Sequence, residues 1–263
     1  MQFCTIPQLG FTVFDVGQDL APDGVGRSRT SEKAAMELAK PGVDIGLCTN
    51  NLDPMLHFWQ HNAGLRFDHV LAIRRGQKQH RHDALGSVVK INHYVEQLPA
   101  APPSGYRELI VTRRGRTEPE RLTDPDGNRV SLVPFGHEGI SQIGIRLAVR
   151  NLDAHCAFYT QVLGLPEEER GIGVAFRAGE TLIILEEQSD APLNSGRLGA
   201  GWRYITFQVF KVDEVHARIL AAGGHEGLAP TTLGTTARIS MILDPDGNWI
   251  ELSQRASIVG TLT

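Results

Sequence analysis

The chain has 263 residues, of which 41% are hydrophobic and 21% are charged, and its formal net charge is -4. This composition is typical of a globular protein and gives no reason to expect a nucleic acid or an acidic membrane as partner. No apolar run is long enough to span a bilayer, and the N-terminus lacks the pattern of a secretory signal. The cysteines, Cys4, Cys48 and Cys156, are scattered, which argues against a disulfide framework or a zinc cluster and favours a cytoplasmic protein.

Residues 1–42 form an N-terminal arm before the first domain. The pattern predicts a strand over residues 11–16 and a short helix over residues 31–40, which Ser31 caps and Pro41 stops. The arm is too apolar for a disordered tail, so we expect it to pack on the first domain.

The first domain is expected to run from residue 43 to residue 134. A strand at 44–49 and a helix at 53–62 are followed by four strands with the sequences HVLAIRR, GSVVKINHY, RELIVTR and RVSLVP. The polar segment QHRHD lies between the first two of these. The last two are too close for a full helix between them, so the second half of this domain is short. The N-terminal arm is one candidate to fill that gap.

A linker, residues 134–139, leads to the second domain, residues 140–254. Its first strand and helix span residues 142–163, and the strands GVAFRAG, TLIILEE and WRYITFQV follow. An amphipathic helix then ends in Gly-Gly, and ARISMIL and NWIELSQ form a closing hairpin. Residues 255–263 form a tail.

Two sequence patterns occur twice in the same order. The segment 44–65 matches the segment 144–165 without a gap, including an aromatic pair, FW or FY, within the helix. The sequence DPDGN occurs at 124–128 and again at 244–248. Because both repeats keep one order, duplication explains them better than chance, and the chain holds two related domains with βαβββ units.

The strand–helix openings, the helix that ends in Gly-Gly and the DPDGNxIEL hairpin together resemble the vicinal oxygen chelate superfamily, over about residues 43–254. This superfamily includes glyoxalase I, methylmalonyl-CoA epimerase, extradiol dioxygenases, fosfomycin resistance proteins and bleomycin-binding proteins. The resemblance implies an α+β fold of two tandem domains whose mixed sheets form cups. Two fused domains look most like the extradiol dioxygenases, in which the second domain carries iron. We therefore expect the active site in the cup of the second domain.

The metal-ligand positions of that superfamily can be compared with this chain one at a time. The two positions that usually carry His are Gly144 and Tyr204, whereas the usual Glu is present as Glu251. A further ligand position lies near Ile184. Because a catalytic transition metal needs about three protein ligands, we expect a degenerate metal site.

The resemblance places several polar side chains on the cup side of the second domain. We expect Glu251 and Tyr204 to transfer protons and Arg146 to hold an anionic oxygen. The alternative is that Glu251 and Arg146 form an ion pair in an inert or simple binding cup. The candidates for substrate binding are Gly144, which leaves room for a substrate, Trp249, Ile184 and Lys90.

The equivalent positions of the first domain, Asp44, Ser131 and Lys90, are also not a conventional ligand set. His80 and His82 would share one face of a strand and could bind a metal with Asp44, although their spacing alone favours a solvent-exposed polar strand or loop. Lys90, in the apolar sequence VVKIN, would pair with Asp44 or a substrate anion if it faces inward. Facing outward, it would be a solvated edge charge.

Three functions follow from these patterns. The leading hypothesis is a small-molecule enzyme of lyase, isomerase or ring-opening type that acts on a carbonyl, enolisable or aromatic substrate. The first alternative is a metal-dependent enzyme similar to extradiol dioxygenases, and the second is a metal-free binding or resistance protein with an aromatic-lined cup. The cofactor is accordingly either none or one divalent metal, Fe, Mn or Zn. The expected partners are a small-molecule substrate and, as an option, a second copy of the chain in a homodimer.

Overall fold

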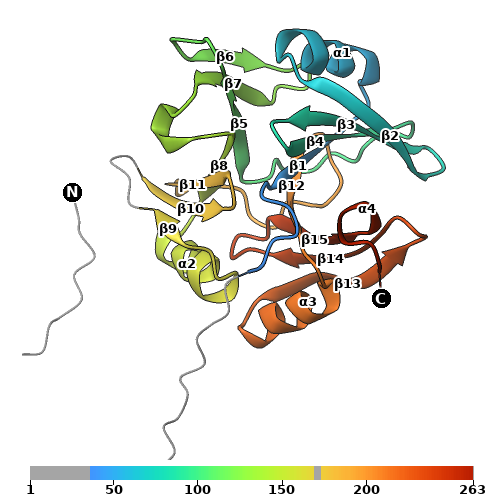
Figure 1. Cartoon of the computed structure of the whole chain (residues 1–263), viewed down its shortest axis with the longest axis vertical. Helices are drawn as coiled ribbons and strands as arrows, with labels where there is room; N and C mark the ends of the chain where they lie inside the picture. The colour runs from blue at the N-terminus through green and yellow to red at the C-terminus, as the bar shows by residue number, and fades with distance from the viewer. Residues whose placement is uncertain (1–35, 169–172, 263) are drawn as a thin grey trace, which may run out of the picture. The chain divides into compact units, whose positions relative to one another are not determined.

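The computed structural model describes residues 36–168 and 173–262, which belong to one compact unit (Figure 1). The predicted strand at 11–16 and the first half of the predicted helix at 31–40 lie outside the described residues. The longest described helix has ten residues, and no described helix has the length and apolar character needed to cross a membrane.

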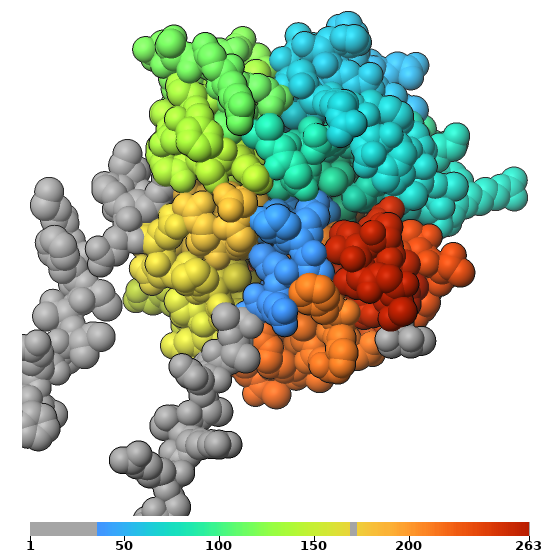
Figure 2. Space-filling view, viewed as in Figure 1, coloured from blue at the N-terminus to red at the C-terminus, as the bar shows by residue number. Residues whose placement is uncertain are grey.

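The described end of the N-terminal arm is not helical, so the predicted helix is wrong over residues 36–40. Leu38 forms an isolated antiparallel bridge with Val209, and the Ala39 N–H donates to the Gln208 carbonyl at 2.8 Å. This pairing gives backbone groups of the arm hydrogen-bond partners in another strand, so they do not need a helix. This contact joins the arm to the second half of the sequence, and Lys40 also pairs with Asp44 in the first half, on which we expected the arm to pack. In Figure 2 this blue segment lies at the surface beside the yellow and orange parts of the chain.

The first of two mixed sheets combines the first and last quarters of the described chain. Its strand order is β13-β14-β15-β12-β1-β4-β3-β2. The strands are β1 (Asp44–Thr49), β2 (Arg66–Arg74), β3 (Gln77–Ala84), β4 (Ser87–Tyr94), β12 (Gly201–Gln208), β13 (His225–Leu233), β14 (Ala237–Leu243) and β15 (Trp249–Arg255). Figure 1 shows β1 and β12 side by side where the blue-green and orange-red parts meet.

The second sheet is formed by the two middle quarters, in the order β6-β7-β5-β8-β11-β10-β9. Its strands are β5 (Tyr106–Arg113), β6 (Glu120–Thr123), β7 (Arg129–Pro134), β8 (Ile143–Val149), β9 (Glu167–Glu168), β10 (Val174–Ala178) and β11 (Thr181–Glu187). The connection from β5 to β6, residues 114–119, contains no helix, as the sequence predicted. Together the two sheets and few helices give the predicted α+β fold.

The helix that opens each repeat changes its winding at the same point. The helices are α1 (Leu52–His57), which continues into the π-helical η1 (Phe58–Asn62); α2 (Leu152–Ala157), which continues into the π-helical η3 (Phe158–Val162); the 3-10 helix η2 (His137–Gly139); α3 (Val212–Ala221); and α4 (Ala256–Val259). Each π turn begins at the repeated aromatic pair, and Trp59 and Tyr159 are both fully buried. Gly64 and Gly164 follow with φ of +63° and +73°, which glycine adopts without strain.

Side-chain alternation gives each sheet one face that packs into the core. In the first sheet β1 contributes Ile45 and Leu47, and β12 contributes Ile205 and Phe207. The intervening side chains of these strands point to the opposite face. That opposite face is where the polar residues of the first sheet gather.

The first sheet is assembled across the two halves of the sequence. β1 pairs with β12 in antiparallel fashion, with Asp44 opposite Thr206 and Gly46 opposite Tyr204. In the second sheet β5 pairs with β8 in the same sense. The prediction that the second domain forms its cup alone is therefore wrong. A sequence repeat identifies similar units, but any exposed strand edge can accept a partner, so the repeat does not fix which units pair.

Several described elements are additional to those predicted, among them β6, β9, β13 and the 3-10 helix η2. Strand β13 lies in the segment HEGLAPTTL, to which the sequence analysis assigned no element; Gly and Pro interrupt the apolar pattern of this segment. Residues 256–259, within the predicted tail, form the short helix α4.

Gly46 provides a test of the pairing between the two halves. A Cβ added to Gly46 would lie 2.3 Å from the Cζ atom of the Tyr204 ring. We expect Gly46→Ala to lower the free energy of unfolding by about 1–3 kcal/mol, because a buried ring must move. Gly144→Ala is the control, since its Cβ would meet the terminal methyl of Ile140 at 2.7 Å, and this methyl can rotate away. Urea unfolding of both variants would contradict the pairing if their losses were equal.

Candidate active site

The face of the first sheet opposite the core carries a row of polar side chains. Arg81 on β3 stands opposite Lys90 on β4. Across β1 and β12 the same row reaches Thr206, which stands beside Glu251 on β15. A cavity of about 540 Å³, here termed the cup, opens on this face. The polar part of its lining includes Gln79, Arg81, Lys90, Gln208, Glu251 and Arg255.

Lys90 and Glu251 meet in the cup although they come from opposite ends of the chain. The Lys90 Nζ donates to Thr206 Oγ1 at 2.6 Å and to Glu251 Oε2 at 3.3 Å. The Thr206 hydroxyl also lies 3.3 Å from the same carboxylate oxygen. The side chains of Lys90 and Glu251 are only 3% and 13% exposed. An ammonium and a carboxylate that share a cavity wall are a suitable pair for proton transfer and for holding an anionic oxygen.

Asp44 supplies a second carboxylate close to Lys90. Its Oδ1 accepts from the Val88 N–H at 2.9 Å and pairs with Lys40, while its Oδ2 accepts from Gln208 Nε2 at 3.1 Å. Burial opposes ionisation, but the Lys40 and Lys90 cations outweigh it and hold the pKa of Asp44 below its usual value. Asp44 is fully buried and its oxygens are occupied, so it helps to neutralise Lys90 and does not line the cup.

Tyr204 forms a platform beneath Lys90. Its ring centroid lies 5.4 Å from the Lys90 Nζ, and its hydroxyl accepts from Asn92 Nδ2 at 3.1 Å and from Gln79 Nε2 at 3.4 Å. Burial, and then the charge of Glu251, raises the pKa of this phenol well above its ordinary value. Tyr204 does not line the cup. Its surroundings therefore favour a positioning role over the predicted proton transfer.

Arg146 lies in the second sheet, away from Glu251. Its guanidinium binds the carboxylates of Glu108 at 2.9 Å, Glu138 at 2.8 Å and Glu186 at 3.0 Å. Both predictions for Arg146, as a substrate anchor beside Glu251 and as the ion-pair partner of Glu251, are therefore wrong. They assumed a cup formed within one half of the sequence.

Gly144 and Ile184 also belong to the second sheet, whose corresponding hollow is filled. A Cβ added to Gly144 would lie 2.7 Å from Ile140 Cδ1, so Gly144 makes room for Ile140 and not for a substrate. Ile184 is buried in a cluster with Ile140, Ile110 and Leu182. The predicted substrate-binding roles of Gly144 and Ile184 are therefore corrected: both residues pack the interior.

Trp249 shares strand β15 with Glu251 but lies at its beginning. Its indole Nε1 donates to the Ser195 carbonyl at 2.8 Å, and its ring packs against Gly227, where an added Cβ would lie 2.7 Å from the ring. Trp249 does not line the cup, so its position does not support the predicted contact with a substrate.

His80 and His82 lie on the face of β3 that is turned away from the cup. His80 stands opposite the core residue Ile91, and His82 Nε2 lies 3.3 Å from Gln60 Nε2 in η1. Asp44 faces the other side of the sheet. The predicted metal site formed by His80, His82 and Asp44 is therefore wrong, because strand alternation separates the imidazoles from the carboxylate.

The cup itself does not fit a divalent metal ion. Glu251 offers one carboxylate to the cavity, and the Lys90 ammonium already binds it. Within residues 36–168 and 173–262, no three His, Cys, Asp or Glu side chains are grouped closely enough to hold a metal. A divalent cation beside Glu251 would also be repelled by the fixed charge of Lys90.

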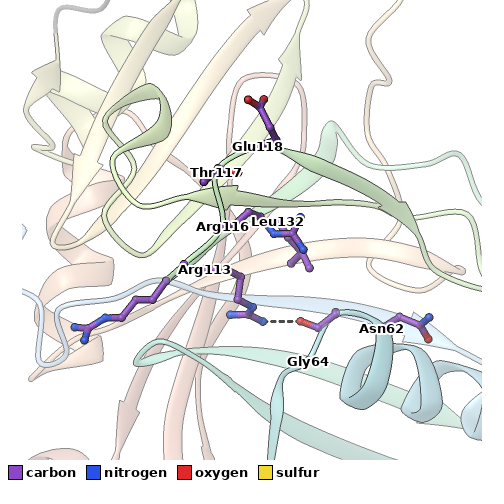
Figure 3. Close-up of a pocket in the computed structure, with 10 residues that line it drawn as sticks. Asn62, Gly64, Arg113, Arg116, Thr117, Glu118 and Leu132 are labelled. Atoms are coloured by element: carbon purple, nitrogen blue, oxygen red, sulfur yellow. Dashed lines mark hydrogen bonds between the residues drawn. The ribbon is translucent and has the colours of Figure 1, made fainter.

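A second cavity, of about 520 Å³, lies where η1 ends (Figure 3). The dashed bond in Figure 3 is donated by Arg113 Nη2 to the Ala63 carbonyl at 2.5 Å, and Arg116 pairs with Glu120 at 2.5 Å. Glu118, the carboxylate of this lining, points away from Arg113 in the same view. This cavity lacks an adjacent acid–base pair, so the cup is the better candidate site.

Sequence reasoning missed Arg81, Gln79 and Thr206 as site residues. The available signal was strand alternation: in the segment QKQHRHDA, Gln79 and Arg81 share the face opposite His80 and His82. Of the two predicted orientations of Lys90, the structure has the inward one. The Lys90 side chain pairs with Glu251 and lies near Asp44.

The buried His82 should make stability depend on pH. Burial lowers the pKa of His82 to about 4, below the unfolded value of 6.5. Between these values the unfolded chain binds the proton more tightly, so stability should fall as pH decreases from about 7 to about 4, by on the order of 3 kcal/mol. Urea unfolding across this range should give a shallower fall for His82→Gln than for wild type. The exposed His57→Gln is the control, and an unchanged slope in His82→Gln would contradict this placement.

The fold and part of the sequence match known proteins. Residues 139–252 match the family model described as the Glyoxalase/Bleomycin resistance protein/Dioxygenase superfamily. A comparison with curated protein sequences gave no significant match. Glyoxalase I from Zea mays has a TM-score of 0.63 at 13% identity, covering 83% of this chain and 95% of its own. The protein described as a "putative dioxygenase" from Bacillus subtilis subsp. subtilis str. 168 has a TM-score of 0.61 at 15% identity, covering 84% of this chain and 86% of its own.

These structural similarities extend over both sheets, whereas the sequence match covers the part from the linker to β15. At such identities they show a shared fold and do not by themselves assign a reaction. The region of residues 139–252 belongs to the Glyoxalase/Bleomycin resistance protein/Dioxygenase superfamily, which is the vicinal oxygen chelate superfamily, and the described part of the chain shares the fold of glyoxalase I.

Proposed function

We propose that this protein is a small-molecule enzyme of lyase or isomerase type, which acts on an enolisable carbonyl compound in the cup. Glu251 is the base, and the Lys90 ammonium holds the oxygen on which negative charge develops. The supporting observation is the Lys90–Glu251 pair on the wall of the 540 Å³ cavity.

The proposed step moves one proton and two electron pairs. The Glu251 carboxylate removes a proton from the carbon next to the carbonyl group, and the C–H electron pair forms the C=C bond of an enolate. The carbonyl electrons move to oxygen, where the ammonium of Lys90 donates a hydrogen bond. In an isomerase the carbonyl group then re-forms and protonated Glu251 returns the proton to a carbon. In a lyase the carbonyl group re-forms, a C=C bond forms as the bond from the next carbon to the leaving group breaks, and protonated Glu251 gives its proton to the departing group.

We assign Lys90 a positive charge in this step because the carboxylates of Glu251 and Asp44 lie close to it. Burial lowers the pKa of Lys90, whereas the carboxylates of Glu251 and Asp44 oppose this change. A fixed ammonium in a cavity shielded from water stabilises an enolate oxygen more strongly than it would in bulk solvent. In this proposal Lys90 has the electrostatic role that a bound metal ion would have in a metal-dependent enzyme.

The alternatives have weaker support. A metal-dependent dioxygenase needs a ligand set that the cup does not offer. A binding protein of the bleomycin-resistance kind was expected to have an aromatic-lined cup. In the described part of the chain no Phe, Tyr or Trp lines the cavity. The polar pair at its wall therefore favours catalysis over simple retention of an aromatic ligand.

Proton exchange tests the proposal without knowledge of the complete reaction. A panel of enolisable aldehydes, ketones, esters and oxo acids is incubated with the protein in D₂O, and loss of the α-proton is followed by NMR. We expect catalysed exchange for at least one class, and a reduction of about 10²- to 10⁴-fold in Glu251→Gln. Glu186→Gln, in the second sheet, is the control and should retain wild-type exchange. Equal exchange in wild type and Glu251→Gln would overturn the proposed role of Glu251.

A further inference from the structure

Arg81 carries a buried positive charge for which the described part of the chain supplies no ion-pair partner. It is 5% exposed and lines the cup. Its Nη1 donates to Gln79 Oε1 at 2.8 Å, but its Nε has no hydrogen-bond partner and the guanidinium has no ion pair among the described residues. A buried charge without a partner destabilises a fold. Its presence in a cavity therefore points to an anion that binds there.

Gln79 holds the Arg81 guanidinium in a fixed orientation. The Gln79 Nε2 donates to Asn92 Oδ1 at 3.0 Å and to the Tyr204 hydroxyl at 3.4 Å, which leaves Gln79 Oε1 to accept from Arg81. Gln79, Asn92 and Tyr204 are all buried. The guanidinium is thus oriented before a ligand arrives, which reduces the entropy lost on binding.

Among the described residues, the cations that line the cup outnumber its carboxylate: Arg81, Lys90 and Arg255 share the lining with Glu251 alone. Lys90 is compensated by Glu251 and Asp44. Arg255, at the same cavity, is partly exposed; burial lowers its pKa, and the charge of Arg81 adds to this effect. One buried, unpaired guanidinium suits a monoanion with two coplanar oxygens, and a carboxylate has this geometry. A phosphate dianion would place more negative charge close to Glu251.

We propose that Arg81 binds the carboxylate of the substrate, which makes the substrate a 2-oxo or 3-oxo carboxylic acid. This inference rests on the proposed function, since it combines the carboxylate site with the carbonyl site at Lys90. Arg81 and Lys90 are direct neighbours on antiparallel strands, so their Cβ atoms are about 4.5–5.5 Å apart. A carboxylate on Arg81 and a carbonyl oxygen on Lys90 are then separated by only a few covalent bonds.

The rest of the cup favours an apolar substituent on this acid. Leu71 and Ile73 from β2 line one part of the cavity, and Leu233 and Ile239 line another. The volume of about 540 Å³ exceeds what a small oxo acid fills. The substrate class that best matches these walls is an oxo acid with an aliphatic or aromatic side chain.

Binding of matched charged and neutral probes tests this assignment. The probes are 4-methyl-2-oxopentanoate, 3-phenyl-2-oxopropanoate, the methyl ester of each and isobutyl phosphate, measured by calorimetry and by thermal shift. We expect at least one acid to bind and to raise the melting temperature, with its ester binding about 10- to 100-fold more weakly. Arg81→Met should weaken acid binding by a similar factor without changing ester binding, and Arg66→Gln, a change of an exposed arginine, should have no effect. Arg81→Lys serves as a second variant, in which the lost fork geometry should weaken the acid more than the ester.

Each result separates this inference from the proposed function. Acid binding through Arg81 without α-proton exchange would support the carboxylate site and count against the Glu251 chemistry. Exchange of an ester at the same rate as its acid, in wild type and in Arg81→Met, would overturn the carboxylate site and leave Glu251 as a base. Tighter binding of isobutyl phosphate, or no binding of either acid, would also overturn the assignment. If neither Arg81 variant folds, the comparison of acids with esters on the wild-type protein decides.

Discussion

The antiparallel pairing of β1 with β12 is the constraint on which the candidate site depends. It joins the first and last quarters of the described chain in one sheet and aligns Asp44 with Thr206. The carboxylate, ammonium and guanidinium of the cup then come from strands on either side of this junction: Arg81 and Lys90 from one quarter, Glu251 from the other. Without this pairing the acid and the ammonium would belong to separate structures.

The two sheets are built from related units, but only the first sheet keeps an open cavity. In the second sheet Gly144 admits the Ile140 side chain, and Arg146 is neutralised by three carboxylates, so the hollow is closed. In the first sheet Gly46 admits the Tyr204 ring, which supports Lys90 from below and leaves space above. A glycine on the opening strand of a repeat thus makes room for packing in both sheets, and the neighbouring side chains decide whether a cavity remains.

The sequence predicted the fold class, the repeats and the cup-facing position of Glu251, because these depend on alternation and on local motifs. It could not predict which repeated units pair, and this single gap misplaced Gly144, Arg146 and Ile184. The burial of Arg81 could not be predicted from the sequence either, because an arginine between two histidines is typical of an exposed strand. His80 and His82 do share one face of a strand, as predicted, but it is the opposite face, which carries Arg81, that lines the cup.

A double-mutant cycle on Lys90 and Glu251 tests the central claim most directly, with the free energy of unfolding as the measured quantity. Lys90→Met alone and Glu251→Leu alone should each cost about 3–5 kcal/mol, because each leaves a buried charge without its partner. The double variant should cost clearly less than the sum of the two, since no unmatched charge remains between them. Additive losses would contradict the account, because they would mean that the two side chains do not meet in one cavity.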